Sequence, residues 1–365
     1  MVIKNIHALG LFGGASLNAV ELALIATDGV DVYDYIKTAT VPYPENLALE
    51  IRAILNHRLI DYKGLENDID VARLKQKISC FYAEIMADFM ADEQVDIIGI
   101  DGLTIGCSPQ NKCSYQIEDG RVVSHALRRQ VITHFHKADI LSKGQASPLS
   151  PMFFNALSHK TEKPVLFIDI EAISSLIYVG ASGELLAFDC APGLAMIEDW
   201  TFKHANMQTD YNGRLAITGK VHPQVVEALL KHKILRKQPP KSLDIMCFSD
   251  KREHLEGLSL EDGAATATNF IAEAIYQAAL DFLPKIPHEI YVGGEGVKNP
   301  SLLRFIKQNF APREVKLLSN LEPNIAALGA CVTAYNAVRR LYALPLTFPA
   351  TTGANEPIIG GEIYG

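Results

Sequence analysis

The stretch IKNIHALGLFGGASLNAVELALIA, residues 3–26, decides the fold class, because a glycine turn joins two apolar segments of strand length. Ile3–Leu11 predicts a buried strand, Gly13–Ser16 a turn, and Val20–Ala26 a second strand. A third strand is expected near Val30–Thr40. Helical periodicity and another buried strand come next, which is typical of an α/β protein.

The second half of the chain repeats this outline. Its predicted elements are strands at Val165–Ile170, Ser174–Val179 and Glu184–Phe188, a turn at Asp189–Gly193, helices between Val225 and Leu283, a strand at Glu289–Val292 and a closing helix at Ile325–Leu341. The repeat predicts two related α/β lobes with a cleft between them. We assign residues 1–150 to the N-terminal lobe and 151–365 to the C-terminal lobe, leaving open that the closing helix and tail pack back on the first.

Composition narrows the class of protein. The 365 residues include 34 basic and 42 acidic side chains, and the net charge of −8 argues against broad nucleic-acid binding but not against a local anion site of backbone amides. Six scattered cysteines without a CxxC pair indicate reduced thiols, Cys107 and Cys113 included. Neither a signal peptide nor a membrane span is expected, so the predicted location is the cytoplasm.

Several spaced segments together carry a resemblance to one family. They are Gly10–Leu17, Gly144–Leu149, Phe188–Gly193, Asp210–Gly213, Pro240–Ser242, Asn299-Pro300 and Thr352–Ala354. In their order and spacing the chain resembles the anhydro-N-acetylmuramic acid kinases, whose superfold is shared by sugar kinases, chaperone ATPases and actin. The resemblance implies a two-lobed actin-like ATPase with duplicated ribonuclease H-like domains and an interlobe cleft.

The resemblance also implies an activity. Such an enzyme uses ATP and Mg²⁺ to open the 1,6-anhydro ring of a recycled cell-wall sugar with water and to phosphorylate O6. The implied partners are the amino sugar and the nucleotide, with no nucleic acid and no membrane, and a homodimer is an option. This chemistry needs amides for phosphates, a base for water and a metal ion.

The nucleotide-binding residues implied by the family fall on two glycine loops. They are Gly13, Gly14, Ser16 and Asn18 in the first, and Gly294 and Gly296 in the second. Asn18 stands where the family has an aspartate, and Glu21 is the remaining carboxylate near that loop, so we assign Glu21 to a metal site. The alternative for Gly13–Ser16 is a plain hairpin turn.

The catalytic base is the largest departure from the family pattern. His134-Phe135-His136 stands where the family has Asp-Phe-Arg, so His134 occupies the position of the base and His136 that of the arginine. Asp139 matches the family and is the second predicted catalytic residue. The two histidines, if extended, could form a metal pair, although a third ligand is missing and two hydrogen-bonded histidines are the favoured interpretation.

Two aspartates are candidates for contact with the sugar. Asp101 begins the segment that replaces the family's His-Gly-Gln-Thr loop, and Asp189 follows an apolar strand. Asp189 is also a candidate metal ligand, with an Asx cap as the alternative. Glu171 and Glu295 stand where the family has glycines that receive phosphate. These departures leave three hypotheses: a divergent kinase, a pseudokinase that acts as a binding or regulatory protein, and a kinase for another sugar.

Overall fold

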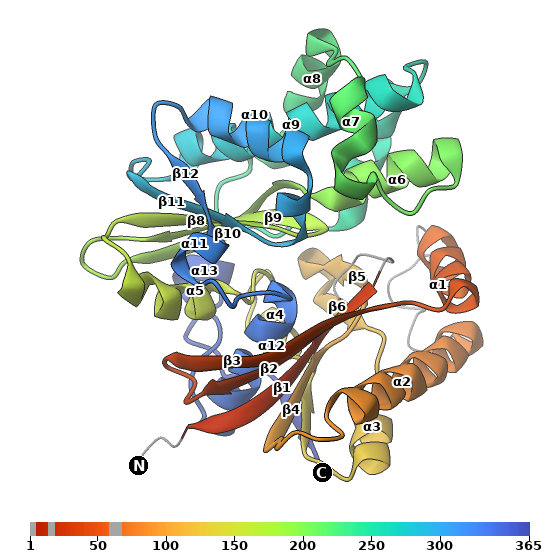
Figure 1. The fold of residues 1–365 in the computed structure, drawn as a ribbon, viewed down its shortest axis with the longest axis vertical. Coiled ribbons are helices and arrows are strands. Elements are labelled where there is room, and N and C mark those ends of the chain that lie inside the picture. Colours follow the sequence, from red (N-terminus) through yellow and green to blue (C-terminus); the bar gives the residue numbers. More distant parts are fainter. Residues whose placement is uncertain (1–4, 14–18, 58–67) are drawn as a thin grey trace. The chain divides into compact units, whose positions relative to one another are not determined.

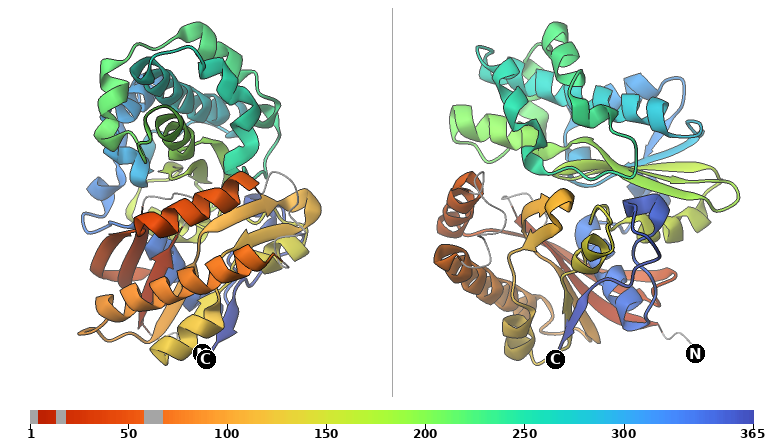
Figure 2. Two further views of the ribbon diagram at one scale, coloured as in Figure 1. Left: turned by 90° about the vertical axis from the view of Figure 1, so that its right-hand side faces the viewer. Right: turned by 180° about the vertical axis from the view of Figure 1, so that it is seen from behind.

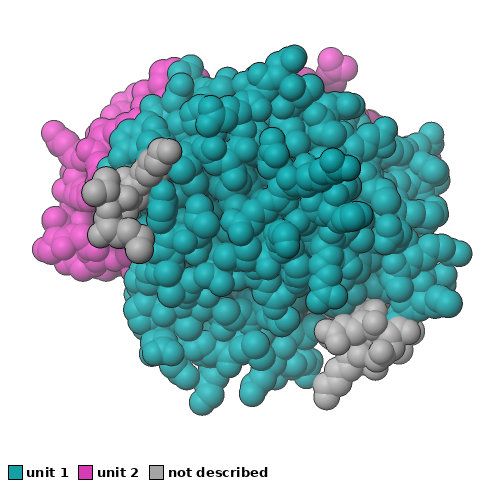
Figure 3. All heavy atoms as spheres, turned by 90° about the horizontal axis from the view of Figure 1, so that it is seen from below, with its two compact units in different colours: residues 1–157, 324–365 teal, residues 158–323 magenta. Residues whose placement is uncertain are grey.

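The computed structural model describes residues 5–13, 19–57 and 68–365 (Figure 1). By internal contacts the chain forms two compact units, which Figure 3 colours separately: Met1–Leu157 with Asn324–Gly365, and Ser158–Pro323. The closing helix α12 (Leu328–Leu341) therefore belongs with the first strands. The division into lobes 1–150 and 151–365 stays a prediction.

The first unit holds a mixed sheet in the order β13-β7-β4-β1-β2-β3. Its strands are β1 (Ile6–Phe12), β2 (Ala19–Thr27), β3 (Val32–Pro42), β4 (Ile97–Asp101), β7 (Val131–Thr133) and β13 (Glu362–Tyr364). A separate hairpin pairs β5 (Thr104–Ser108) with β6 (Cys113–Gln116). Strands β1, β2 and β3 are antiparallel neighbours, whereas β4 runs parallel to β1 and β7 parallel to β4.

The second unit repeats this topology. Its sheet has the order β10-β9-β8-β11-β12, from β8 (Val165–Ile170), β9 (Ile173–Val179), β10 (Leu185–Pro192), β11 (Glu289–Gly293) and β12 (Val315–Leu317). Again three consecutive strands are antiparallel, and two later strands run parallel to the first. Apart from β13, which extends the first sheet alone, the order and directions of the strands agree, and this confirms the predicted duplicated α/β fold.

Helices cover the sheets within each unit (Figures 1 and 2). In the first unit they are α1 (Glu45–His57), α2 (Ile69–Phe89), α3 (Gly120–Leu127), α4 (Lys137–Leu141), α5 (Pro151–Leu157), α12 and α13 (Pro349–Thr352). In the second they are α6 (Leu194–Ala205), α7 (Arg214–Thr218), α8 (Pro223–Leu230), α9 (Leu260–Phe282), α10 (Pro300–Phe310) and α11 (Leu318–Leu321).

Side-chain caps explain where the long helices begin. Asp68 accepts hydrogen bonds from two backbone amides at the start of α2, and Ser259 accepts one from Asp262 at the start of α9. Asn299 caps α10 in the same way, with Pro300 in the first helical position. Such caps satisfy amides that have no partner inside the helix.

Strand β1 shows why the first sheet is covered on both faces. Leu9 and Leu11 join a buried cluster with Ile78 of α2, whereas Gly10 faces α12 from the opposite side. A Cβ atom on Gly10 would lie 2.0 Å from the carbonyl oxygen of Ala330, so only glycine lets the helix backbone come this close. Because successive residues of β1 point to opposite faces of the sheet, one face packs against α2 and the other against α12.

One predicted segment is wrong. Asp189–Gly193 was expected to be a turn, but β10 continues to Pro192 with a register shift between Asp189 and Ala191. Gly193 then precedes α6. Proline and glycine are strong turn signals, but the proline here is the last residue of β10 and the glycine lies outside the strand.

Replacing Gly10 by alanine tests the contact between β1 and α12. We expect Gly10→Ala to lower the free energy of unfolding by about 2–4 kcal/mol, because the methyl group meets backbone rather than a movable side chain. Gly365→Ala is the control, since its nearest neighbours would lie 3.6 Å or more from the new Cβ. Equal urea midpoints for the two variants would contradict the packing described here.

Candidate functional site

Four ionisable side chains gather where β4, β6 and β7 end in the first unit. Asp101 is the last residue of β4, Glu118 lies two residues after β6, and His134 and His136 follow β7. Close contacts connect them as two pairs, Asp101 with His136 and Glu118 with His134. The structure thus brings the predicted residues Asp101 and His134 into one region and adds Glu118 to them.

The pair of His136 and Asp101 is an ion pair. His136 Nε2 lies 3.0 Å from Asp101 Oδ1, and its Nδ1 lies 2.8 Å from the carbonyl oxygen of Ala146. Both ring nitrogens therefore face acceptors, which requires two protons on the ring. Burial lowers the pKa of His136, but the Asp101 carboxylate and the Ala146 carbonyl outweigh it and raise the pKa to about 9. At neutral pH His136 is a cation, as the family's arginine would be.

Glu118 is a carboxyl group without solvent contact. Its side chain is 0 % exposed, and Oε1 shares a short hydrogen bond with the hydroxyl of Thr133. Oε2 has no hydrogen-bond partner within the described part of the chain, and it lies against Gly102, where a Cβ atom would come within 2.0 Å. Burial raises the pKa of Glu118 to about 8, although the bond to Thr133 opposes the shift.

His134 sits at a strained position beside Glu118. Its φ of 59° lies in the left-handed region, which costs a non-glycine residue about 1–2 kcal/mol. Nδ1 lies 3.2 Å from Thr133 Oγ1 and 3.5 Å from Glu118 Oε1, whereas Nε2 has no hydrogen bond to any described residue. Burial lowers the pKa of His134, so the ring is neutral at pH 7.

The two histidines do not form a metal pair. The extended segment that would put both rings on one side is absent, because His134 is left-handed and His136 has helical angles. Each ring also has its own acceptors. Both rings are hydrogen-bonded, which agrees with the favoured interpretation of two solvated or hydrogen-bonded histidines.

Asp139, the second predicted catalytic residue, is buried and fully engaged. Oδ2 accepts a hydrogen bond of 2.7 Å from the amide of Ala146. Oδ1 accepts bonds of 2.5 Å from the hydroxyls of Thr347 and Thr352. The carboxylate thus ties the loop after α4 to the C-terminal segment, and a catalytic role for it stays a prediction.

Glu21, the predicted metal ligand, lies at the start of α12. It is buried on β2, and Oε2 lies 3.4 Å from the amide nitrogen of Ala330 in the first turn of that helix. A negative charge is favourable at a helix N-terminus. This contact offsets part of the cost of burying the carboxylate, and the assignment of Glu21 to a metal site stays a prediction.

In the second unit, Asp189 joins β9 and β10 to a loop. Oδ1 accepts a hydrogen bond of 2.8 Å from the hydroxyl of Ser175, and Oδ2 accepts one of 2.9 Å from the amide of Leu243. The side chain is buried, and the backbone amide of Asp189 itself donates to the carbonyl oxygen of Lys241. Binding of sugar or metal by Asp189 stays a prediction.

The predicted nucleotide loop in this unit contains a carboxylate. Glu171 Oε1 accepts a hydrogen bond of 3.2 Å from the amide of Glu295, between Gly294 and Gly296. Gly294 has a φ of 82°, and a Cβ atom on it would lie 2.9 Å from the same Oε1. An amide in the loop is thus already bound to an anionic oxygen.

The first nucleotide loop lies mostly outside the described residues. This applies to Gly14, Ser16 and Asn18. Gly13 is described and buried, and its amide donates to the carbonyl oxygen of Asp101. A Cβ atom on Gly13 would lie 2.6 Å from the hydroxyl of Tyr82, so packing alone requires glycine there.

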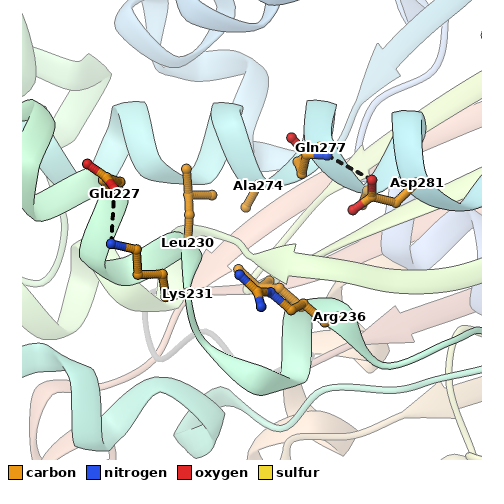
Figure 4. A pocket seen from close by; sticks show the side chains of 9 residues that line it. Glu227, Leu230, Lys231, Arg236, Ala274, Gln277 and Asp281 are labelled. Atoms are coloured by element: carbon orange, nitrogen blue, oxygen red, sulfur yellow. Dashed lines mark hydrogen bonds and ion pairs between the residues drawn. The ribbon is translucent and has the colours of Figure 1, made fainter.

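Neither the pocket found in the second unit nor a search for metal-binding clusters in the described chain adds a site that contains the predicted residues. A pocket of 330 Å³ in the second unit lies between α8, Lys233–Arg236 and α9, with Glu227 paired to Lys231 and Gln277 bonded to Asp281 (Figure 4). None of the predicted site residues lines it. Within residues 5–13, 19–57 and 68–365, no cluster of three or more His, Cys, Asp or Glu is placed to hold a metal ion.

Two sequence predictions concern the whole chain. Cys80 is exposed and Cys190 and Cys331 are buried, and the reduced state of the six thiols stays a prediction. None of the described helices has both the length and the apolar character that crossing a membrane requires.

Sequence reasoning missed Glu118 and Thr133. Glu118 is followed by Asp119, and two adjacent acids after a strand are typical of an exposed turn. Thr133 ends a strand of three residues, too short for a periodic pattern. No signal in the sequence marks either residue as buried and paired.

The duplicated topology defines the class as a two-lobed actin-like ATPase fold. Comparison with known proteins then shows the family. The family model described as anhydro-N-acetylmuramic acid kinase matches residues 6–365. The chain belongs to this family.

Curated relatives agree with this assignment. The anhydro-N-acetylmuramic acid kinases of Paramagnetospirillum magneticum and Acidiphilium cryptum are each 34% identical to it, over 97% and 98% of this chain and 98% of each relative. Among solved structures, a ROK family glucokinase from Streptomyces griseus shows 13% identity and a TM-score of 0.38 over 91% of this chain and 98% of its own.

The contribution of the Asp139 hydrogen bonds to stability can be measured. We expect Asp139→Asn to destabilise the protein by about 2–4 kcal/mol, since the amide cannot accept all three hydrogen bonds and leaves a buried donor unmatched. Asp88→Asn, on the exposed side of α2, is the matched control. If the thermal unfolding temperature changes equally little in both variants, Asp139 does not have this structural role.

Proposed function

We propose that the chain is an active ATP-dependent anhydro-N-acetylmuramic acid kinase in which His134 replaces the family's aspartate as the base. The observation that carries this proposal is the imidazole of His134, which keeps 23% of its side chain exposed and has an Nε2 atom without a partner among the described residues. A neutral ring whose nitrogen carries no proton can accept one from water.

The proposed reaction makes and breaks three bonds. The oxygen of a water molecule bonds to the anomeric carbon while Nε2 of His134 takes its proton. The bond from that carbon to the bridging oxygen breaks, and the freed O6 accepts the phosphoryl group. ATP, when bound, would supply that phosphoryl group as its terminal bridging P–O bond breaks and ADP leaves.

One feature of the second unit supports the proposal that it binds a nucleotide phosphate. The amide of Glu295 already binds a carboxylate oxygen, so the loop with Gly294 and Gly296 presents an amide suited to an anion. Gly13, Gly14, Ser16 and Asn18 are proposed for the other phosphate loop, and Asp101 and Asp189 for the sugar. The cytoplasm, which supplies ATP, is the proposed location, and a homodimer stays a prediction.

The two residues proposed from sequence as magnesium ligands already take part in hydrogen bonds. Glu21 contacts a helix amide, and Asp189 uses both oxygens for hydrogen bonds. Mg²⁺ prefers several free oxygen ligands or water. No step of the reaction above is therefore assigned to a protein-held metal ion.

Replacing His134 tests the proposal. In an assay with ATP, Mg²⁺ and the anhydro sugar, we expect His134→Gln to lower kcat by about 10²–10⁴-fold, because glutamine cannot accept the proton. His125→Gln, at an exposed position on α3, is the matched control and should keep full activity. Turnover by the wild-type chain no faster than by His134→Gln would contradict the proposal.

The second candidate function is that of a pseudokinase, a binding or regulatory protein without catalysis. One observation favours it: the Glu171 carboxylate occupies the Glu295 amide and would repel a nucleotide phosphate. This contact lies in the nucleotide loop implied by the family, so it bears on affinity for ATP rather than on the base.

Calorimetry with ATP and Mg²⁺ separates the two candidates. We expect Glu171→Gln to bind ATP about tenfold more tightly than the wild type, because one like charge near the phosphates is removed. Glu162→Gln, exposed in the same unit, should bind as the wild type does. Undetectable binding by wild type and Glu171→Gln alike would favour the pseudokinase.

A further inference from the structure

Three side chains form a continuous hydrogen-bonded series from solvent into the interior of the first unit. Nδ1 of His134 lies 3.2 Å from Oγ1 of Thr133, which in turn makes the short hydrogen bond to Oε1 of Glu118. Thr133 and Glu118 are both fully buried, whereas the imidazole is partly exposed. The series therefore connects a surface nitrogen with an interior carboxyl group.

The protonation state of Glu118 determines which group donates in each hydrogen bond of the series. The threonine hydroxyl carries one proton and can donate to only one neighbour at a time. When Glu118 is ionised, Thr133 donates to it, and His134 must donate from Nδ1 to the threonine oxygen. When Glu118 is protonated and donates to Thr133, the hydroxyl donates to Nδ1, and the ring proton sits on Nε2.

We propose that Glu118, Thr133 and His134 form a proton relay in which Glu118 is the final proton acceptor and selects the tautomer of His134. Ionised Glu118 leaves the Nε2 lone pair free for water, and protonated Glu118 places a proton on it. The catalytic part of this inference rests on the function proposed above, whereas the tautomer selection does not.

The relay balances during the proposed reaction. One proton leaves water for Nε2 of His134, the Nδ1 proton moves to Thr133, and the threonine proton moves to Oε1 of Glu118. The O–H bond of water and the two donor bonds break as three new bonds to hydrogen form. The net result is the transfer of one proton from water to Glu118, which becomes a neutral acid.

The surroundings of Glu118 suit a proton store better than a structural ion pair. Oε2 has no partner in the described part of the chain, and a carboxylate held for structure alone is normally bonded through both oxygens. Gly102 is the residue that leaves room for Oε2. The hydroxyls of Tyr43 and Tyr82, which bond to each other at 3.0 Å, lie nearby without a bond to Glu118.

Burial of Glu118 chiefly sets the pH at which the relay changes direction, and charged neighbours modify it. The groups that act on Glu118 are Asp101, Lys75 and His136, and those that act on His134 are Glu362, Lys137, Lys75 and His136. Because the pKa of Glu118 is raised to about 8, the acid is mostly protonated at pH 7 and ionised above pH 8. The base is thus switched on as pH rises.

Nitrogen-15 NMR of the histidine rings tests the selection directly on the wild-type chain. We expect Nε2 of His134 to change from protonated to unprotonated as the pH rises through about 8, while Nδ1 changes in the opposite sense. The ring of His125, at an exposed position on α3, serves as the internal control. A His134 ring that carries its proton on Nε2 at every pH above 7 would overturn the relay.

Kinetics of matched variants test the catalytic part. We expect wild-type kcat to rise with pH and level off above about 8, and Glu118→Gln to lose this rise and about 10²-fold in kcat with an unchanged KM. Thr133→Ser should keep the profile, and Thr133→Val should lose it. An unchanged profile in Glu118→Gln would overturn the relay, whereas an inactive wild type with the NMR switch intact would overturn only the proposed function.

Discussion

The close contact between α12 and the first sheet determines how the first unit is built. Gly10 on β1 and Gly99 on β4 face this helix, and a Cβ atom on either would collide with its backbone. Helix and sheet can approach this closely only because both strand positions lack a side chain. The contact brings a helix that begins at residue 328 against strands near residues 10 and 99.

Because α12 packs on the first sheet, the segments that follow it lie close to the candidate site. The hydroxyls of Thr347 and Thr352 reach the buried carboxylate of Asp139, and β13 pairs with β7 immediately before His134. The last residues of the chain also supply Glu362, which pairs with Lys137. The environment of His134 thus depends on segments more than 200 residues away in the sequence.

The candidate site combines two histidines with opposite behaviour. His136 is surrounded by acceptors on both ring nitrogens and is a cation at pH 7, so it keeps the charge of the arginine it replaces. His134 is partly buried beside Glu118 and is neutral. Of the two histidines that stand where the family has Asp and Arg, one is therefore neutral and the other keeps the positive charge.

The sequence predicted two halves that each open with three strands, because apolar segments of strand length separated by turns occur in both. The structure reproduces one of these strands, Val165–Ile170, residue for residue. Prediction from the sequence failed where local signals were ambiguous: Asp189 continues a strand despite the Pro-Gly that follows. The partners of His134 could not be predicted, because Glu118 and Thr133 meet only after two short strands have joined the sheet. Burial of an acid depends on tertiary contacts that periodicity does not encode.

The protonation of Glu118 is the central claim. Carbon-13 NMR of its side-chain carboxyl carbon, titrated from pH 5 to 10 and assigned with Glu118→Gln, measures it directly. The account predicts a protonated acid at pH 6.5 that titrates near pH 8. Titration near the ordinary value of about 4.3 would show that Glu118 is a plain carboxylate at neutral pH and would contradict the account.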